Sequence, residues 1–185
     1  MGSFLFLIAL LLTAMPVDAS DLTLYGGFQR QGMVTLDTGT TGQLGQAAKQ
    51  TFDPRNFGVF GIRYGKGRVV GSEHTLAYTP NFIESSRKAI LYHSNLIVQA
   101  PLPVVRPYGT VGVGAVFTMG NSVVDLGRKF AINYGGGVKI LPAGPVGIRF
   151  DIRGYTIPSV QRSGSSIEAG TLNIAEVSVG VIFSY

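Results

Sequence analysis

The chain closes with an alternating stretch, Val177-Ser178-Val179-Gly180-Val181-Ile182-Phe183-Ser184-Tyr185. Side chains two apart in a strand share a face, so one face would be entirely apolar. It comprises Val177, Val179, Val181, Phe183 and Tyr185. On the opposite face, Ile182 is the one apolar exception among small and polar residues. An apolar face that ends in an aromatic residue favours a strand in contact with lipid, although a soluble β-sandwich can end in the same way.

The composition favours a membrane barrel over other classes. The 185 residues are 45% hydrophobic and only 14% charged, with 26 glycines and no Cys or Trp, and the mean hydropathy is +0.30. No run of about 18 apolar residues is present, so a transmembrane helix does not explain this apolarity. Instead, apolar residues alternate with Gly and polar residues, as strands with one lipid-facing side require. The absence of Cys excludes disulfides, zinc-thiolate sites and a lipidated N-terminal Cys.

Residues 1–19 have the pattern of a secretory signal peptide. An unbroken apolar run spans residues 4–12, Pro16 ends it, and Val17-Asp18-Ala19 places small side chains near a cleavage site. No Lys or Arg precedes the run, which leaves an uncleaved anchor as the alternative. We expect a signal peptide over 1–19 and one barrel domain over 20–185. Cleavage would remove a single charged residue, Asp18, and raise the net charge from +5 to +6.

The remaining chain divides into eight segments with a period of two. We expect strands over residues 22–33, 57–64, 69–78, 88–98, 108–118, 130–140 and 146–155, followed by the terminal strand. Their lengths suit tilted strands of about 9–11 residues that cross a bilayer. Long connections (34–56, 79–87, 119–129 and 156–173) alternate with tight ones (65–68, 99–107 and 141–145). This rhythm predicts an outer-membrane barrel with short periplasmic turns, long external loops and both termini in the periplasm.

The placement of charge distinguishes this barrel from a soluble one of the same strand number. A soluble eight-stranded barrel carries its polar face outside, but the polar face here is mostly Gly, Ser, Thr and Ala, with few charges. Such residues suit a narrow, filled interior. We therefore expect a lumen charge network, because a lone buried charge is very costly. Its members by strand parity are Arg63, Glu73, Lys139, Arg149, Asp151, Arg153 and Glu176.

Several motifs in order along the chain resemble one family. They are Arg106-Pro107-Tyr108 with Gly112-Val113-Gly114, then Tyr134-Gly135-Gly136-Gly137-Val138-Lys139, then Gly147-Ile148-Arg149-Phe150-Asp151-Ile152-Arg153, and the aromatic C-terminus. Together they resemble the eight-stranded barrel domain of OmpA-type and opacity-type outer-membrane proteins of Gram-negative bacteria. The resemblance implies an all-β, antiparallel, up-and-down transmembrane barrel. It also implies that the apolar face of the terminal strand is the signal for the barrel-assembly machinery. We expect no peptidoglycan-binding domain after the barrel, so the resemblance implies no cell-wall tether.

The motifs that suggest chemistry have simpler interpretations. The run Gly135-Gly136-Gly137 lacks the following Lys-Ser or Lys-Thr of a phosphate loop, so it indicates close backbone packing. His74 falls on the outward face and His93 on the lumen face, beside Asn95. An outer-membrane lipid A-modifying enzyme or protease needs a nucleophile and an orienting acid near its base. The spacing provides neither, and we expect no catalytic residue, metal or cofactor.

Basic residues cluster where strands meet the long connections. They are Arg55, Arg87, Lys88, Arg128 and Lys129. The phosphates of outer-leaflet lipopolysaccharide would lie at this level, and a ring of cations would attract them. Ordinary solubilising loop charges are the alternative. Nucleic-acid binding is not expected, because the excess charge is spread around the barrel and not focused in one patch.

These patterns lead to a single hypothesis about function. We expect a monomeric, non-enzymatic protein of the cell outer membrane with a structural or surface-interaction role, whose loops 34–56 and 156–173 meet the exterior. Its partners would be membrane lipid, lipopolysaccharide and the assembly machinery. The first alternative is a small passive pore of low conductance, since eight strands leave little free interior. The second and third are a soluble ligand-binding barrel and a lipid A-modifying enzyme.

Overall fold

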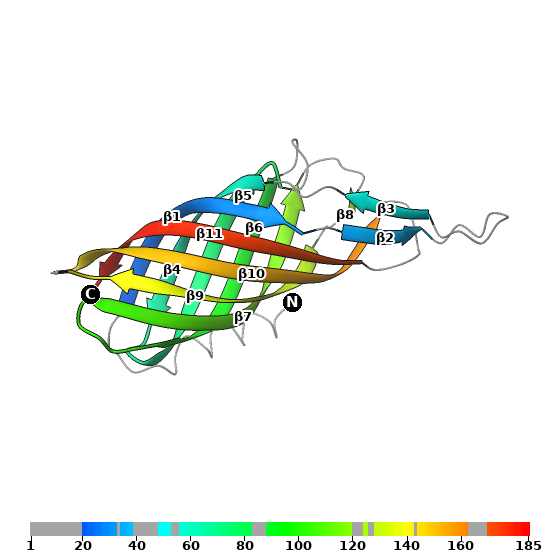
Figure 1. Ribbon diagram of the computed structural model, residues 1–185. Coiled ribbons are helices and arrows are strands. Elements are labelled where there is room, and N and C mark those ends of the chain that lie inside the picture. Colours follow the sequence, from blue (N-terminus) through cyan, green and yellow to red (C-terminus); the bar gives the residue numbers. More distant parts are fainter. Residues whose placement is uncertain are drawn as a thin grey trace, which may run out of the picture.

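The protein folds into a closed antiparallel barrel (Figure 1). The computed structural model describes residues 20–32, 34–38, 48–52, 56–82, 88–119, 124–125, 128–142, 144–162 and 170–185. The strands of the barrel wall are β1 (Ser20–Gln31), β4 (Asn56–Lys66), β5 (Val70–Pro80), β6 (Lys88–Gln99), β7 (Val105–Met119), β9 (Arg128–Ile140), β10 (Val146–Arg162) and β11 (Gly170–Ser184). Each pairs with the next along the chain, and β11 pairs with β1. The prediction of an eight-stranded, all-β, up-and-down barrel is therefore confirmed.

The seam between the first and last strands is fully bonded. Pairing runs from Asp21 opposite Ser184 to Gln31 opposite Ile174. Beyond it, the backbone amide of Ser20 donates to the carbonyl of Tyr185, and the amide of Tyr185 donates to the carbonyl of Ser20. A closed barrel leaves no unpaired strand edge within the membrane. The terminal strand is thus part of a continuous wall, and its last residues lie at the end of the barrel that carries the tight turns (Figure 1).

Three short strands lie outside the barrel wall. β2 (Val34–Thr38) and β3 (Ala48–Phe52) pair with each other within the first long connection, and β8 (Val124–Asp125) pairs with the end of β10. Sequence periodicity did not predict them because they are short and interrupt polar connections. Within the described residues, no helix is long and apolar enough to span a membrane.

The prediction of a loop over residues 156–173 is wrong for most of that range. β10 continues to Arg162 and β11 begins at Gly170. The physical reason is inward packing, since Ile157 and Leu172 pair across the two strands and are almost fully buried inside the barrel. Their burial extends the strands beyond the point where the outer alternation becomes polar.

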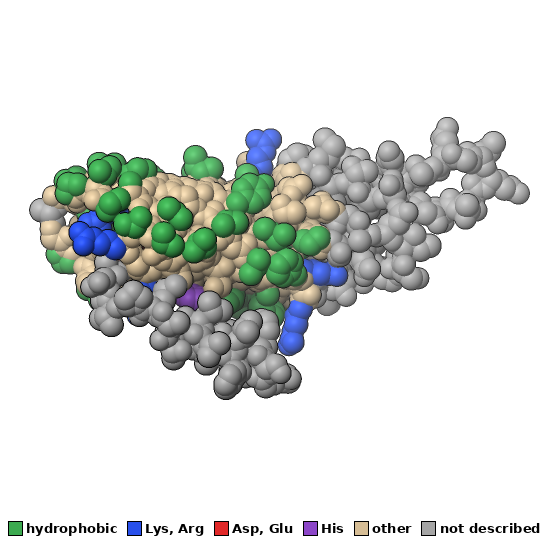
Figure 2. Space-filling model, turned by 90° about the horizontal axis from the view of Figure 1, so that it is seen from below, with side chains coloured by type: hydrophobic (Ala, Val, Ile, Leu, Met, Phe, Trp, Pro, Cys, Tyr) green, Lys and Arg blue, Asp and Glu red, His purple; other side chains and the backbone are tan. Residues whose placement is uncertain are grey.

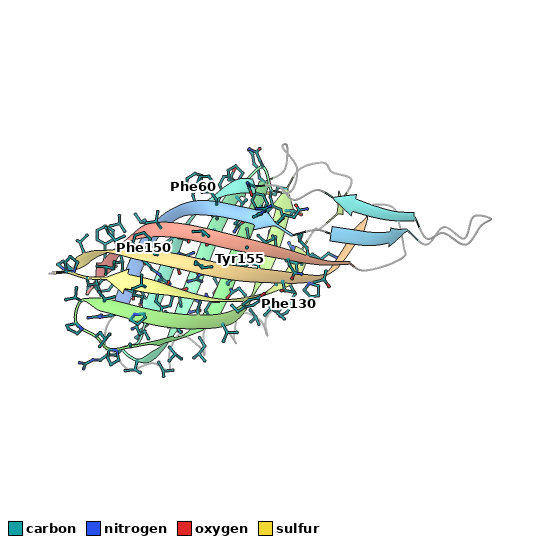
Figure 3. All side chains as sticks on the ribbon, in the orientation of Figure 1. Phe60, Phe130, Phe150 and Tyr155 are labelled. Carbon is teal, nitrogen blue, oxygen red and sulfur yellow. The ribbon has the colours of Figure 1, made fainter. Side chains whose placement is uncertain are left out.

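The outer wall carries an apolar side chain at most alternate positions. Figure 2 shows hydrophobic side chains spread over the barrel wall, with basic ones nearer its two ends. In Figure 3, Phe60 and Phe130 project away from the barrel, whereas Tyr155 points inward, and these residues are 58%, 52% and 2% exposed. On the terminal strand Val177, Val179, Val181 and Phe183 are outward, and Tyr185 follows them. An outer surface of this kind is favourable in contact with lipid and unfavourable in contact with water.

The interior consists of two zones. Toward the tight turns it holds charged and polar side chains, whereas toward the long connections it holds a buried apolar cluster. This cluster includes Phe57, Val59, Phe82, Leu91 and Ile157. The ring of Phe82, which follows β5, packs edge-on against Phe57 with centroids 5.4 Å apart. The sequence analysis did not identify this cluster, because Phe82 and Ile157 lie in segments that it expected to be loops.

Because the outer wall faces lipid, we expect the cost of a charged substitution there to depend on its depth in the bilayer. Val111 lies midway along β7 and Val105 begins it, and both side chains are exposed on the outer wall. We expect Val111→Arg to destabilise the barrel by about 2–4 kcal/mol and Val105→Arg by about 0–1 kcal/mol. Guanidinium unfolding of the protein in phospholipid vesicles measures both values. Equal costs for the two variants would contradict a bilayer centred on the middle of β7.

Candidate functional site: the charged barrel interior

All seven side chains of the expected lumen charge network lie inside the barrel. Arg63 comes from β4, Glu73 from β5, Lys139 from β9 and Glu176 from β11. Arg149, Asp151 and Arg153 alternate along the inward face of β10. Each of the seven is at most 2% exposed. Because these positions face inward on five different strands, charged residues that are distant in sequence come together inside the barrel.

Asp151 is the centre of this network. Its Oδ2 accepts from Nη1 of Arg63 at 2.8 Å and from Nε of Arg149 at 3.1 Å, and its Oδ1 accepts from Nη2 of Arg153 at 3.0 Å. The hydroxyl of Tyr108 also donates to Oδ1. Three guanidinium groups thus converge on one carboxylate, an arrangement that requires further negative charge nearby.

Glu73 and Glu176 provide that charge. Glu73 lies 2.6 Å from Nη2 of Arg149 and 2.6 Å from Nη2 of Arg153. Glu176 accepts from Nη2 of Arg63 at 2.7 Å, from Nε2 of Gln29 at 2.7 Å and from the hydroxyl of Tyr155 at 2.9 Å. Three buried arginines therefore meet three buried carboxylates. Charge-assisted hydrogen bonds of this length offset the desolvation that burial imposes on each ion.

Lys139 lies apart from these six residues. Its Nζ donates to Oδ2 of Asp21 at 2.6 Å and to Oε1 of Gln99 at 2.9 Å. Nε2 of Gln99 in turn donates to the carbonyls of Gly67 and Arg68 in the turn after β4. The network expected from the sequence did not include Asp21, which is the ion-pair partner of Lys139. Asp21 shares the inward parity of Thr23 and Tyr25, so extending the first predicted strand by one residue would have found it.

Aromatic rings fill the space beside the guanidinium groups. The ring of Tyr25 lies 3.5 Å from the guanidinium carbon of Arg63, and the ring of Tyr108 lies 4.6 Å from that of Arg149. Both contacts are in the range of cation–π attraction. Gly137 makes room for Tyr108, because a Cβ there would lie 2.5 Å from the Tyr108 hydroxyl and 2.0 Å from the Phe150 carbonyl oxygen. Close packing is thus the structural role of this glycine.

The two histidines occupy opposite faces, as parity predicted. His93 is buried with its ring 5.0 Å from that of Tyr155. His74 is on the outer wall, where Nδ1 lies 3.0 Å from the hydroxyl of Tyr92. Within the described ranges, no hydrogen bond or ion pair joins His93 to a nucleophile or a carboxylate, and no group of three potential metal ligands is present.

The basic residues near the long connections are only partly placed. Lys88 begins β6 and Arg128 begins β9, and both are exposed. Lys129 is half-buried and alternates with the exposed Arg128 and Phe130, so it lies on the inward side of the strand end. Arg55 and Arg87 lie outside the described residues, as does the segment 1–19. The structure therefore puts two of the five expected cations on the outer face at this end.

Because the buried charges balance one another, we expect the effects of substituting two of them on stability to be strongly coupled. Asp151→Asn would leave three arginines with two carboxylates, and we expect a cost of about 3–5 kcal/mol. Adding Arg149→Met restores neutrality and preserves the Arg63–Glu176 and Arg153–Glu73 pairs. We expect the double variant to be more stable than the sum of the single effects by about 0.5–3 kcal/mol. Guanidinium unfolding in vesicles measures this difference, and additive effects would contradict a coupled network.

Comparison with solved structures finds the same barrel fold. Neisserial surface protein A is 14% identical, with a TM-score of 0.64, over 89% of this chain and 97% of that chain. The N-terminal barrel domain of Pseudomonas aeruginosa OprF is 16% identical, with a TM-score of 0.53, over 91% of this chain and 98% of that chain. OprG of the same bacterium is 11% identical, with a TM-score of 0.53, over 90% and 96%. No curated protein sequence matches the chain.

The family model for the outer membrane protein beta-barrel domain matches residues 4–183. This match spans nearly the whole chain, and the closed barrel with an apolar outer wall is the structure that such a domain requires. The resemblance to OmpA-type and opacity-type barrels is thereby confirmed. The chain belongs to the outer membrane protein beta-barrel domain family, and the protein is a β-barrel of the cell outer membrane.

Proposed function

We propose that the protein is a non-enzymatic, structural or surface-interaction component of the outer membrane that acts through its external loops. The observation that carries this proposal is the filled interior. Lys139, Asp21 and Gln99 are bonded together near the tight turns, the arginine–carboxylate network follows, and the apolar cluster lies toward the long connections. A ligand arriving from outside therefore meets the connections and the outer wall.

The filled interior also argues against the pore. Eight strands enclose space for side chains and little more, and both zones of this interior are occupied by buried residues. An ion on its way through would have to separate Arg63, Arg149 or Arg153 from its carboxylate partners. Each separation exposes a charge to a poorly solvated interior, at a cost of several kcal/mol.

The enzymatic alternative has little support in the geometry of the described residues. The buried His93 lacks a hydrogen-bonded nucleophile there, and the network carboxylates are held by arginines. A carboxylate engaged by two or more guanidinium groups is a poor general base. We propose that the network is structural and holds the barrel in one arrangement.

Biogenesis and lipid contacts complete the proposal. Residues 1–19 act as a signal peptide for export, residues 20–185 form the barrel domain, and the apolar face of the terminal strand is the signal for the barrel-assembly machinery. The cations near the long connections contact lipopolysaccharide phosphates. The exposed positions of Lys88 and Arg128 support this last point. In the membrane the protein acts as a monomer.

Planar-bilayer recording tests the proposal against a pore. We expect no stable conductance steps from the purified protein, because the ion pairs and the apolar cluster block the interior. Glu73→Gln and Arg149→Gln should leave this result unchanged or produce only irregular openings as the network loosens. Stable steps in the native protein that change size in either variant would establish a pore instead.

Lipopolysaccharide retention tests the cation ring. Replacing Arg55, Arg87, Lys88, Arg128 and Lys129 by Gln should lower the lipopolysaccharide that copurifies with the protein, because each lost cation near the phosphates weakens binding by about 1 kcal/mol. The matched control replaces Arg68 and Arg106, near the tight turns, by Gln. Equal retention by the native protein and the fivefold variant would contradict the ring, and so would an equal loss in the control.

A further inference from the structure

The apolar cluster inside the barrel contains one residue that belongs to no strand. Among the described members of this cluster, Phe82 alone lies outside the strands. It follows Pro80, whose pairing with Lys88 is the last between β5 and β6 toward the long connections. Its side chain is fully buried, and its ring meets that of Phe57 edge-on, with the planes at 72°. Phe82 thus fills the mouth of the lumen, the end nearest the long connections.

The backbone of Asn81 directs this ring inward. Along β5, Tyr78 and Pro80 lie on the outer side and Thr79 is buried. A strand that continued beyond Pro80 would therefore place residue 82 on the outer face. Asn81 instead has a φ of 57°, in the left-handed region, which Asn adopts more readily than most residues. This turn interrupts the alternation, and Phe82 enters the barrel.

The strands leave room for Phe82 because several of their inward side chains in the cluster are small. Ala77 on β5, Ala89 on β6 and Ala131 on β9 are each at most 3% exposed. Alanines alone do not fill a barrel interior to the density of a protein core. The ring of Phe82 supplies the missing volume from a connection. Its withdrawal would break no strand pairing, because Phe82 takes part in none.

Buried polar side chains lie directly below the apolar cluster. Asn133 on β9 and His93 on β6 each follow a member of the cluster by one inward position, toward the tight turns. Among the described residues, neither the side-chain amide of Asn133 nor Nε2 of His93 has a hydrogen-bond partner. β7 adds no side chain between them, because Gly112 pairs with Asn133 and Gly114 with His93. These groups are complementary to a polar molecule with both donors and acceptors.

We propose that Phe82 is a stopper in the external mouth of the lumen, and that its withdrawal, with Asn81 as the hinge, admits water and small neutral polar molecules to Asn133 and His93. The left-handed backbone of Asn81 is less favourable than an extended one, so rotation there makes an open state accessible. An entering molecule gives the buried polar groups the hydrogen bonds that they lack in the closed state.

The opening ends inside the barrel. Below Asn133 and His93, the arginine–carboxylate network still closes the lumen. The proposal rests on the outward orientation of the long connections in the proposed function. It adds to that function a compartment that is accessible from outside and closed toward the periplasm.

Alkylation of a buried thiol by iodoacetamide, a small neutral amide, measures the opening of the stopper. The chain has no Cys, so Asn133→Cys provides a single reporter in the detergent-purified protein, and intact-protein mass follows its reaction. In this background Phe82→Ala should raise the alkylation rate about tenfold, because the ring no longer fills the mouth. Resistance to unboiled detergent confirms that each variant is folded.

The matched control for Phe82→Ala is Leu91→Ala, which enlarges the space above His93 but retains the stopper. We expect this control to change the alkylation rate of the Asn133→Cys reporter by no more than about twofold. Equal rates in the two alanine variants would overturn the proposal, because any cavity in the cluster would then admit the reagent.

A second pair of variants tests the hinge. Asn81→Val disfavours the left-handed backbone, because a β-branched side chain clashes there, and should raise the alkylation rate about tenfold. Asn81→Gly adopts this backbone without a steric penalty and should leave the rate within about twofold. Equal rates in these two variants would also overturn the proposal. Stable conductance steps in the native protein would overturn the proposed function instead, and the ratios of alkylation rates would still decide the stopper.

Discussion

Charge neutrality inside a barrel filled with side chains is the constraint on which the rest of this structure depends. An ionised side chain moved from water into a protein interior loses several kcal/mol of hydration, and only close opposite charge and hydrogen bonds restore it. Here Arg63, Arg149 and Arg153 meet Asp151, Glu73 and Glu176, while Lys139 meets Asp21. Four cations thus match four anions. Because the partners come from different strands, the ion pairs also tie the wall together across the lumen.

The apolar zone complements the charged zone. Toward the long connections the interior changes to residues such as Phe57, Phe82 and Leu91, which need no partners and pack by shape. The two zones close the interior by different means, one through ion pairs and one through packing. In a barrel of this size the side chains fill the lumen. This leaves the external connections and the outer wall as the surfaces for interaction.

The wall obeys one alternation with local departures. Apolar side chains face lipid at most outward positions, yet His74 bonds to Tyr92 on that face. A polar pair facing lipid is stable when its groups bond to each other. Gly61 has a different role, because a Cβ there would point into the lumen and meet the ring of Tyr25. Small residues therefore make room for the aromatic rings on the inner surface of the wall.

The amino-acid sequence by itself determined the strand number, the inward and outward faces, and the family. A period of two is a property of single strands, so Val177 to Tyr185 indicates a lipid face without any knowledge of neighbours. The same parity put seven charged side chains on the inner face. Tertiary structure alone decided the pairing, because contacts such as Lys139 with Asp21 depend on strand register and barrel closure. It also decided the length of β10 and β11, which extend because Ile157 and Leu172 pack into the apolar cluster inside the barrel.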